Sequence, residues 1–350
     1  MKRTPHLAAG RLIAGLVAAA GLLAACGSSS ATTESTTPAV LPAIKVTSVK
    51  GDNLSAVMAA LYARVLEDNG FRVSRVDPVS LDRKGYLDAL AAGTFDLIPD
   101  FSNDTLKYLI ESGAVATTTT APAGATTTTL PKGTKNAGRS SAEQVITIAS
   151  MLPKGVAVGH GTLAENAWTI ACTDSATTSA DKKSNLANLS GLGAGASKVV
   201  LGAPSWFLTD PDQGLKEWTS TYTGTFKKVI TVEEGGVADA LLAKQADCFV
   251  MNSLDPVITQ KALNPLTDDK AMFFSNAVVA LLSEKQASSA LSTALDKVNN
   301  TLTTARLNQM LNEIVANHTD PVVVANAFLR SEEHTSELQS HSFISYAVFC

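Results

Sequence analysis

The stretch IKVTSVKGDNLSAVMAALYARVLEDNGFRV (residues 44–73) decides the fold, because its pattern passes from strand to helix and back to strand. The first six residues alternate between apolar and polar, and apolar residues then recur at helical spacing. Asp52 and Asn53 supply a helix cap between the two patterns, and Gly70 supplies the stop. The order strand, helix, strand is typical of an α/β protein.

The same local pattern occurs twice in the chain. The next helix and strand fall within residues 86–98, and the spacing from Leu90 to Asp96 recurs from Leu241 to Asp247. Each half therefore contains a helix, a short turn, an aspartate and a strand. We expect two similar α/β halves that face each other across a cleft.

Polar and aromatic residues follow the strand of each half. PDFSND (residues 99–104) follows the first of these strands, and MNSLD (residues 251–255) follows the second. Open α/β sheets bind ligands at the carboxyl ends of their strands. These two runs are therefore the first candidates for a binding site.

The rest of the chain extends this pattern. Residues 153–158 start a second α/β run that ends near Met251. From Ser283 the chain is predicted to be helical, with Ser283 and Gln286 spaced as a capping box. Asp320-Pro321 is predicted to cap and open the last helix. We expect these final helices to return to the first half.

The amino terminus resembles a lipoprotein signal. Basic residues precede an apolar run over residues 12–25, and small residues precede Cys26. The apolar run is too short for a transmembrane span. We expect residues 1–25 to be a signal peptide, Cys26 to carry the lipid, and residues 26–43 to be a disordered Ser/Thr tether. The alternative is an ordinary signal peptide with a chance cysteine.

Two other segments differ in composition from the globular pattern. A Thr-rich insertion over residues 116–138 lacks the apolar residues that a folded segment needs, so we expect a disordered loop. The segment 330–350 contains two pieces that resemble translated sequencing-adapter DNA, and we exclude it from the fold as non-native. A genuine carboxyl-terminal segment is the alternative.

The net charge, the cysteines and the absence of catalytic motifs argue against several classes of function. The net charge is −4 and the chain has no basic run, which argues against nucleic-acid binding. In an exported protein, Cys172 and Cys248 form the one pair left for a disulfide, and two buried free thiols are the alternative. The sequence has no HExxH, G-x-S-x-G or CxxC motif. We therefore expect no catalytic residue, no metal and no cofactor.

Several motifs together resemble one family, the substrate-binding proteins of osmoprotectant ABC importers that take up glycine betaine, carnitine or choline. The resemblance spans residues 45–329. It is carried by LYARVLEDNGFRV (61–73), the run that ends in Asp100-Phe101, LPKGVAV (152–158), AEN (164–166), VLGAPSWF (200–207), GLKEW (214–218) and LNEIVANHTDPVVVANAFL (311–329).

The resemblance implies an α/β fold with two lobes, the type II clamp of periplasmic binding proteins. Lobe I would comprise residues 44–152 and 254–329, and lobe II residues 153–253. It implies a binding protein that is not an enzyme, anchored by lipid to the extracytoplasmic face of the cell membrane. Its partners would be a small quaternary-ammonium ligand and a membrane permease, with no nucleic acid, and we expect a monomer.

In that family an aromatic cage holds the quaternary ammonium by cation–π attraction. Phe101 falls where a cage tyrosine is usual, followed by Ser102, whereas Asn252 falls where another aromatic residue is common, followed by Ser253. The arginine often found after the GAP-x-x-F segment is absent, because residues 209–212 read TDPD. These departures weaken the expectation of betaine specifically.

Four further candidates complete the predicted site. Asp52 and Asn53 match the position of the family's first binding loop, where free N–H groups at a helix start favour anionic ligand atoms. Trp168 and Trp206 could supply cage walls or could be core residues.

Asp100 and Asp255 could serve as an acid–base pair, but no nucleophile accompanies them, so we expect local structural roles.

A binding protein for another small zwitterion or amine is the closest alternative function. A surface enzyme on the same fold is the alternative from a different class, because fold alone does not fix function.

Overall fold

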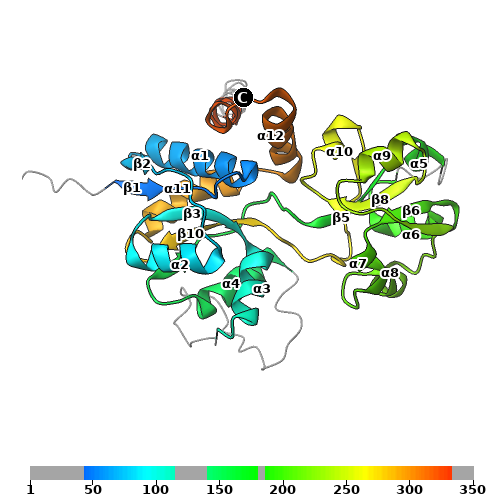
Figure 1. Cartoon of the computed structure of the whole chain (residues 1–350), viewed down its shortest axis with the longest axis horizontal. Helices are drawn as coiled ribbons and strands as arrows, with labels where there is room; N and C mark the ends of the chain where they lie inside the picture. The colour runs from blue at the N-terminus through cyan, green and yellow to red at the C-terminus, as the bar shows by residue number, and fades with distance from the viewer. Residues whose placement is uncertain (1–42, 115–139, 180–185, 333–350) are drawn as a thin grey trace, which may run out of the picture. The chain divides into compact units, whose positions relative to one another are not determined.

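The computed structural model describes residues 43–114, 140–179 and 186–332, which form two mixed sheets flanked by helices (Figure 1). The first sheet has the strand order β2-β1-β3-β10-β4, and the second has the order β7-β6-β8-β5-β9. Each sheet combines parallel and antiparallel neighbours. The predicted two-lobed α/β architecture is confirmed.

The first lobe contains both ends of the described chain. Its helices α1 and α11 cover one face of the sheet and α2 covers the other (Figure 1). The elements are β1 (Ile44–Val46), α1 (Asn53–Asp68), β2 (Val73–Arg75), α2 (Arg83–Ala92), β3 (Leu97–Phe101), α3 (Ser102–Glu111), α4 (Ser141–Met151), β4 (Val156–Val158), β10 (Val278–Ser283), α11 (Ser289–Asn299) and α12 (Thr304–Asn317), followed by a helical segment over residues 321–332.

The second lobe occupies the middle of the chain. Helices α6, α7 and α8 pack on one face of its sheet, and α9 and α10 pack on the other. The elements are β5 (Trp168–Cys172), α5 (Asp174–Ser179), α6 (Leu189–Gly195), a 3₁₀ turn (Ala196–Lys198), β6 (Val200–Ala203), α7 (Ser205–Thr209), α8 (Leu215–Tyr222), β7 (Lys228–Thr231), α9 (Val237–Leu242), β8 (Cys248–Asn252), α10 (Val257–Gln260) and β9 (Asn264–Pro265).

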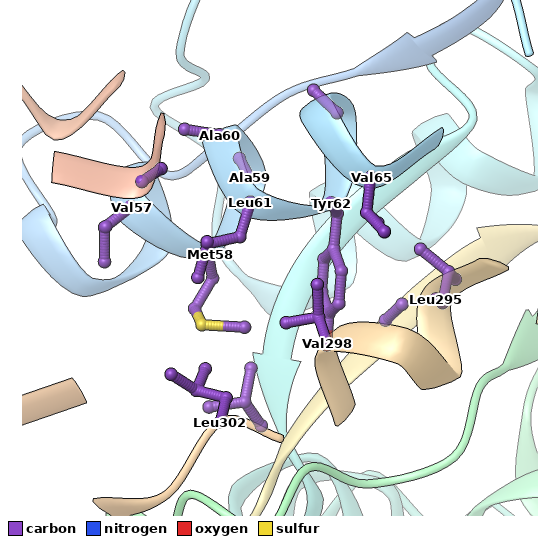
Figure 2. Packing of buried hydrophobic residues seen from close by; sticks show 14 of the residues in the cluster. Val57, Met58, Ala59, Ala60, Leu61, Tyr62, Val65, Leu295, Val298 and Leu302 are labelled. Carbon is purple, nitrogen blue, oxygen red and sulfur yellow. The ribbon is translucent and has the colours of Figure 1, made fainter. Parts of the chain in front are cut away.

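Helix α1 forms where its sequence predicts it. Asp52 is the N-cap and its carboxylate accepts hydrogen bonds from the first turn, and Gly70 follows the helix with φ 82°. The apolar face of α1 is almost fully buried, and Figure 2 shows Met58 and Tyr62 directed toward residues that follow or belong to α11, including Val298. Burial of this face stabilises the lobe by about 1.5–3 kcal/mol for each large side chain.

The predicted internal repeat has a structural basis. The carboxylate of Asp96 accepts from the Lys45 backbone N–H at 2.9 Å, and the Asp96 N–H donates to the Lys45 carbonyl. In the second lobe, Asp247 makes the same two bonds with the backbone of Val200. Each aspartate therefore fixes the start of the neighbouring parallel strand, which explains why it recurs at the same spacing.

The predicted lobe boundaries are wrong at both crossings. Residues 153–158 were assigned to lobe II, but β4 pairs with β10 in the first sheet. Residues from 254 onward were assigned to lobe I, but β9 pairs with β5 in the second sheet. Sheet membership of such short strands depends on distant partners, which their own residues do not identify.

The predicted capping box at Ser283 and Gln286 is also wrong. Ser283 is the last residue of the fully buried strand β10, and Ser288 caps α11 instead. By contrast, Asp320 does cap the segment that follows it, because its carboxylate accepts from the Val322 N–H at 2.7 Å. That segment and α11 pack on the first lobe, as predicted.

Cys172 and Cys248 are joined by a disulfide within the second lobe. They lie directly opposite each other on the antiparallel strands β5 and β8, with a Cα–Cα distance of 4.0 Å. Four residues away, the same pair of strands places Trp168 opposite Asn252.

Several predicted segments lie outside the described residues. These are the signal peptide, Cys26, all but the last residue of the tether, and the Thr-rich insertion. Of the segment 330–350, only residues 330–332 are described, and they continue the last helix. Within the described ranges, no helix combines the length and hydrophobicity of a membrane span.

Candidate functional site

A cavity of about 340 Å³ opens in the first lobe at the carboxyl ends of β1 and β3. These strands are neighbours in the sheet, so the loops that follow them meet at one edge. The first turns of α1 and α2 supply the other walls. The lining residues are Val49, Asp52, Leu54, Ser55, Met58, Leu81, Arg83, Tyr86, Pro99, Asp100, Phe101, Asp104 and Val278.

Phe101 is the aromatic wall of this cavity. It is the last residue of β3, it is half-buried, and it pairs with Val278 across the sheet. Its backbone N–H donates to the Asp100 carboxylate at 2.8 Å, which fixes the turn into α3. The ring therefore stands on a rigid strand end at the position where ligands bind in α/β sheets.

Asp100 is the centre of a buried hydrogen-bond network. Its carboxylate accepts from the Arg83 Nε and Nη2 atoms at 2.9 and 2.7 Å, from the Tyr86 hydroxyl, and from the Thr105 Oγ1 at 2.8 Å. Burial, together with the charge of Asp100, raises the pKa of Tyr86 well above its usual value, so the phenol stays protonated and donates. Asp100 thus has the local structural role that the sequence predicted.

Asp52 lines the cavity, but its carboxylate also works as a helix cap. One oxygen accepts from the Leu54 and Ser55 N–H groups at 2.9 and 3.0 Å. These are donors that were expected to hold anionic ligand atoms, and the protein's own carboxylate already holds them. Asn53 is exposed and does not belong to the cavity lining.

Ser102 was predicted in the site, but its hydroxyl is directed into the protein. The residue is fully buried, its Oγ donates to the Gln144 Oε1 at 2.6 Å, and it accepts from the Ala277 N–H at 3.0 Å. Ser102 therefore joins α3, α4 and the start of β10 and does not line the cavity. The prediction of a ligand contact from its side chain is wrong.

Asp104 lines the cavity from the first turn of α3; it ends the candidate run 99–104 but was not singled out as a site residue. It is half-buried, and burial raises the pKa of its carboxyl above the usual value, although the charge of Arg83 and the side chain of Asn276 oppose this shift. None of the ion pairs among the described residues includes Asp104. Its carboxylate is thus partly desolvated without a dedicated counter-ion.

The second lobe brings the two predicted tryptophans together. The rings of Trp168 and Trp206 lie 4.7 Å apart at 55°, and both are partly buried against the core of this lobe. The Trp206 Nε1 is buried and has no hydrogen-bond partner among the described residues. Neither ring lines the cavity of the first lobe, so the choice between core and cage stays a prediction.

Asn252 and Ser253 make local contacts at the end of β8. The Asn252 Oδ1 accepts from the Leu254 N–H at 2.8 Å, which closes a turn. The Ser253 Oγ donates to the Glu165 carbonyl at 2.6 Å and accepts from the Ala167 N–H at 3.1 Å. Asn252 therefore stabilises the turn after β8, and Ser253 stabilises the segment that leads into β5.

The structure thus separates the predicted residues into two groups. Asp52 and Phe101 share the first-lobe cavity, whereas Trp168, Trp206 and Asn252 share the strand ends of the second lobe. The described residues contain no cluster of His, Cys, Asp and Glu that could hold a metal ion. Sequence reasoning missed Arg83 and Tyr86, and it named Asp104 only as part of the run 99–104. The sequence offered one indication of Arg83: a buried Asp100 would need a cationic partner.

Comparison with known proteins identifies a family whose sequence pattern the chain matches. The family described as the substrate binding domain of the ABC-type glycine betaine transport system matches residues 42–331. No curated protein sequence matches the chain.

Among solved structures, a glycine betaine/carnitine/choline ABC transporter is 18% identical, with a TM-score of 0.63 over 83% of this chain and 98% of that one. Apo YehZ from Escherichia coli is 16% identical, with a TM-score of 0.66 over the same shares of the two chains. These likenesses establish the type II binding-protein fold.

Proposed function

Because the chain belongs to the family of substrate-binding domains of ABC-type glycine betaine transport systems, we propose that it captures a small quaternary-ammonium osmoprotectant and delivers it to a membrane permease. Glycine betaine, choline and carnitine are the candidate ligands. The members of this family are solute-binding proteins and not enzymes. The protein's task is then to bind, enclose and release its ligand.

One observation carries the proposed ligand class. Phe101 stands half-buried at the wall of a cavity of about 340 Å³, beside the carboxylates of Asp52 and Asp104. An aromatic face attracts a cation that has lost its water, and nearby carboxylates add to this attraction. The tryptophan pair of the second lobe would complete the enclosure when the lobes close. Trp168 and Trp206 offer the aromatic faces with the strongest attraction for a cation.

Closure would require bending between the lobes, and the chain passes between them in two crossing segments, residues 159–167 and 266–277. They pair with each other where Glu165 faces Ala277, and the Ser275 hydroxyl donates to the Glu165 carboxylate. We infer that ligand binding shifts an equilibrium between open and closed lobes about these segments. The permease would recognise the closed form.

We also propose that the protein acts on the extracytoplasmic face of the membrane, held by a lipid on Cys26. The pattern of residues 1–26 supports this anchor. The disulfide between Cys172 and Cys248 fits an oxidising compartment. We expect the protein to act as a monomer.

One difference between this chain and the family pattern favours a second class of ligand. Asn252 stands where the family commonly has an aromatic residue, and it pairs with Trp168 in the sheet. A cage reduced in this way would also accept another small zwitterion or amine. A surface enzyme on the same fold is the remaining alternative, and it differs in being able to convert its ligand.

A thermal-shift panel with chemical analysis of the ligand tests the proposal. We expect the purified chain to gain thermal stability with at least one quaternary-ammonium compound, because ligand that binds only the folded state stabilises it by mass action. The bound compound should be recovered unchanged after release. Conversion of the compound would identify an enzyme, and stabilisation by other amines alone would favour the second ligand class.

A further inference from the structure

The charged residues that line the first-lobe cavity restrict the net charge of the ligand. Four lining residues carry a charge at neutral pH, namely three carboxylates and one guanidinium. The carboxylates belong to Asp52, Asp100 and Asp104, and the guanidinium belongs to Arg83. The fifth ionisable group, Tyr86, is a neutral phenol at this pH, and burial raises its pKa further. The cavity therefore carries a net negative charge.

The single cation of the lining is already committed to a partner within the protein. Arg83 directs its Nε and Nη2 at the two oxygens of Asp100, in the two-pronged geometry that guanidinium and carboxylate favour. A ligand carboxylate would have to compete with Asp100 for this fork. Arg83 and Asp100 together are neutral, so the net charge of the cavity comes from Asp52 and Asp104.

The start of α1, which could also hold an anion, is occupied. A helix start offers free N–H donors and a positive partial charge, which favour a carboxylate. At the start of α1 the Leu54 and Ser55 donors are bonded to Asp52. The protein has thus placed its own anion where a zwitterionic ligand would place its carboxylate.

The second lobe adds no cation at its strand ends. The segments after β6, β7 and β8 are residues 204–214, 232–236 and 253–256, and they contain no lysine or arginine. They contain five acidic residues, which are Asp210, Asp212, Glu233, Glu234 and Asp255. In the first lobe, Lys50 is exposed and lies outside the cavity lining. The segments that follow these second-lobe strands are therefore acidic, as is the cavity of the first lobe.

We propose that the site selects a small organic cation that carries no carboxylate, of the choline class, and that Asp104 is the counter-ion of its ammonium group. This inference rests on the proposed function. Asp104 is the carboxylate of the lining that neither caps a helix nor pairs with a cation among the described residues. A bound cation would give Asp104 the ion-pair partner that it lacks among the described residues, and the same cation would contact Phe101.

Choline and glycine betaine test this proposal, because they share a trimethylammonium group and differ in net charge. Calorimetric titration of the purified chain should give a choline Kd about tenfold or more below that of glycine betaine. Asp104→Asn should raise the choline Kd about tenfold and change the glycine betaine Kd less than about twofold. The substitution keeps the size of the side chain.

A matched control removes an equal charge elsewhere. Asp88→Asn acts on an exposed carboxylate of α2 that pairs with Lys84 outside the cavity, and it should change neither Kd. Asp104→Glu retains the charge and should preserve the preference for choline.

The possible outcomes separate the two proposals. Glycine betaine or another zwitterion binding as tightly as choline would overturn the charge selection and leave the proposed function intact. An Asp104→Asn variant that weakens both ligands equally, or neither, would remove Asp104 as the counter-ion. A folded chain that binds none of choline, glycine betaine, carnitine and proline betaine would overturn the proposed function and this inference together.

Discussion

The substitution Asp100→Ala tests the view that Asp100 organises the cavity without serving as a reactive group. The carboxylate is 6% exposed and accepts five hydrogen bonds, two of them from the guanidinium of Arg83. Its removal leaves a largely buried guanidinium and the buried Tyr86 hydroxyl without this acceptor. Breaking a buried ion pair by removing one partner costs about 3–5 kcal/mol. Because the Arg83 side chain keeps 28% exposure, we expect the lower end, about 3 kcal/mol.

Urea unfolding at neutral pH measures this loss, with Asp88→Ala as the control. Asp88 pairs with Lys84 on the surface at 65% exposure, so its replacement should cost less than about 0.5 kcal/mol. Adding Arg83→Met to Asp100→Ala should recover part of the loss, because no unpaired guanidinium remains. A cost for Asp100→Ala within about 1 kcal/mol of the control would refute this account of the network.

Three further predictions follow from the site and the fold. Phe101→Ala should weaken ligand binding by about 1–2 kcal/mol in calorimetry, and an unchanged affinity would remove Phe101 from the site. Reducing the disulfide between Cys172 and Cys248, which are 76 residues apart, should lower the unfolding free energy by about 4 kcal/mol, measured by urea unfolding with and without reductant. The raised pKa of Asp104 means that its carboxylate opposes folding at neutral pH, an effect that disappears as the pH falls below the ordinary value of 3.8. Asp104→Asn should therefore unfold at a higher temperature than the wild type at pH 7, and the difference should shrink in acid; equal melting temperatures at pH 7 would contradict it.

Asp104 is expected to lower the stability of the free protein and to raise its affinity for choline. In the unliganded protein, Asp104 is partly desolvated and lacks a cation of its own among the described ion pairs. A bound cation would relieve this cost, so part of the ligand's affinity would come from the destabilised free state. The same substitution is thus expected to raise stability and lower affinity for choline.

The fold was largely predictable where local patterns are strong. Helix α1 has a cap, a full apolar face and a stop within its own sequence, so its bounds needed no knowledge of the rest of the chain. The repeat of Asp96 and Asp247 was visible as spacing, and the structure explains it by identical bonds to neighbouring strands. The three-residue strand β4 was assigned to the wrong lobe, because its partner β10 follows about 120 residues later.

The site was predictable in position but not in detail. The carboxyl end of β3 identified Phe101, because strand ends of α/β sheets carry ligand sites. The direction of a polar side chain depends on partners that only the fold brings close. Ser102 turns inward to Gln144, and Asp52 turns back to cap its own helix. Asp104 was part of the candidate run 99–104 but was not singled out, because its significance comes from the lack of a cationic partner among the described ion pairs, which a sequence does not show.

The central claim is that this protein binds small quaternary-ammonium compounds, and calorimetric titration of the purified chain tests it most directly. The panel consists of glycine betaine, choline, carnitine and proline betaine. We predict saturable heat with at least one of them, at a Kd of about 1 μM or below, near −8 kcal/mol. The absence of heat with all four, from protein that circular dichroism shows to be folded, would contradict the claim.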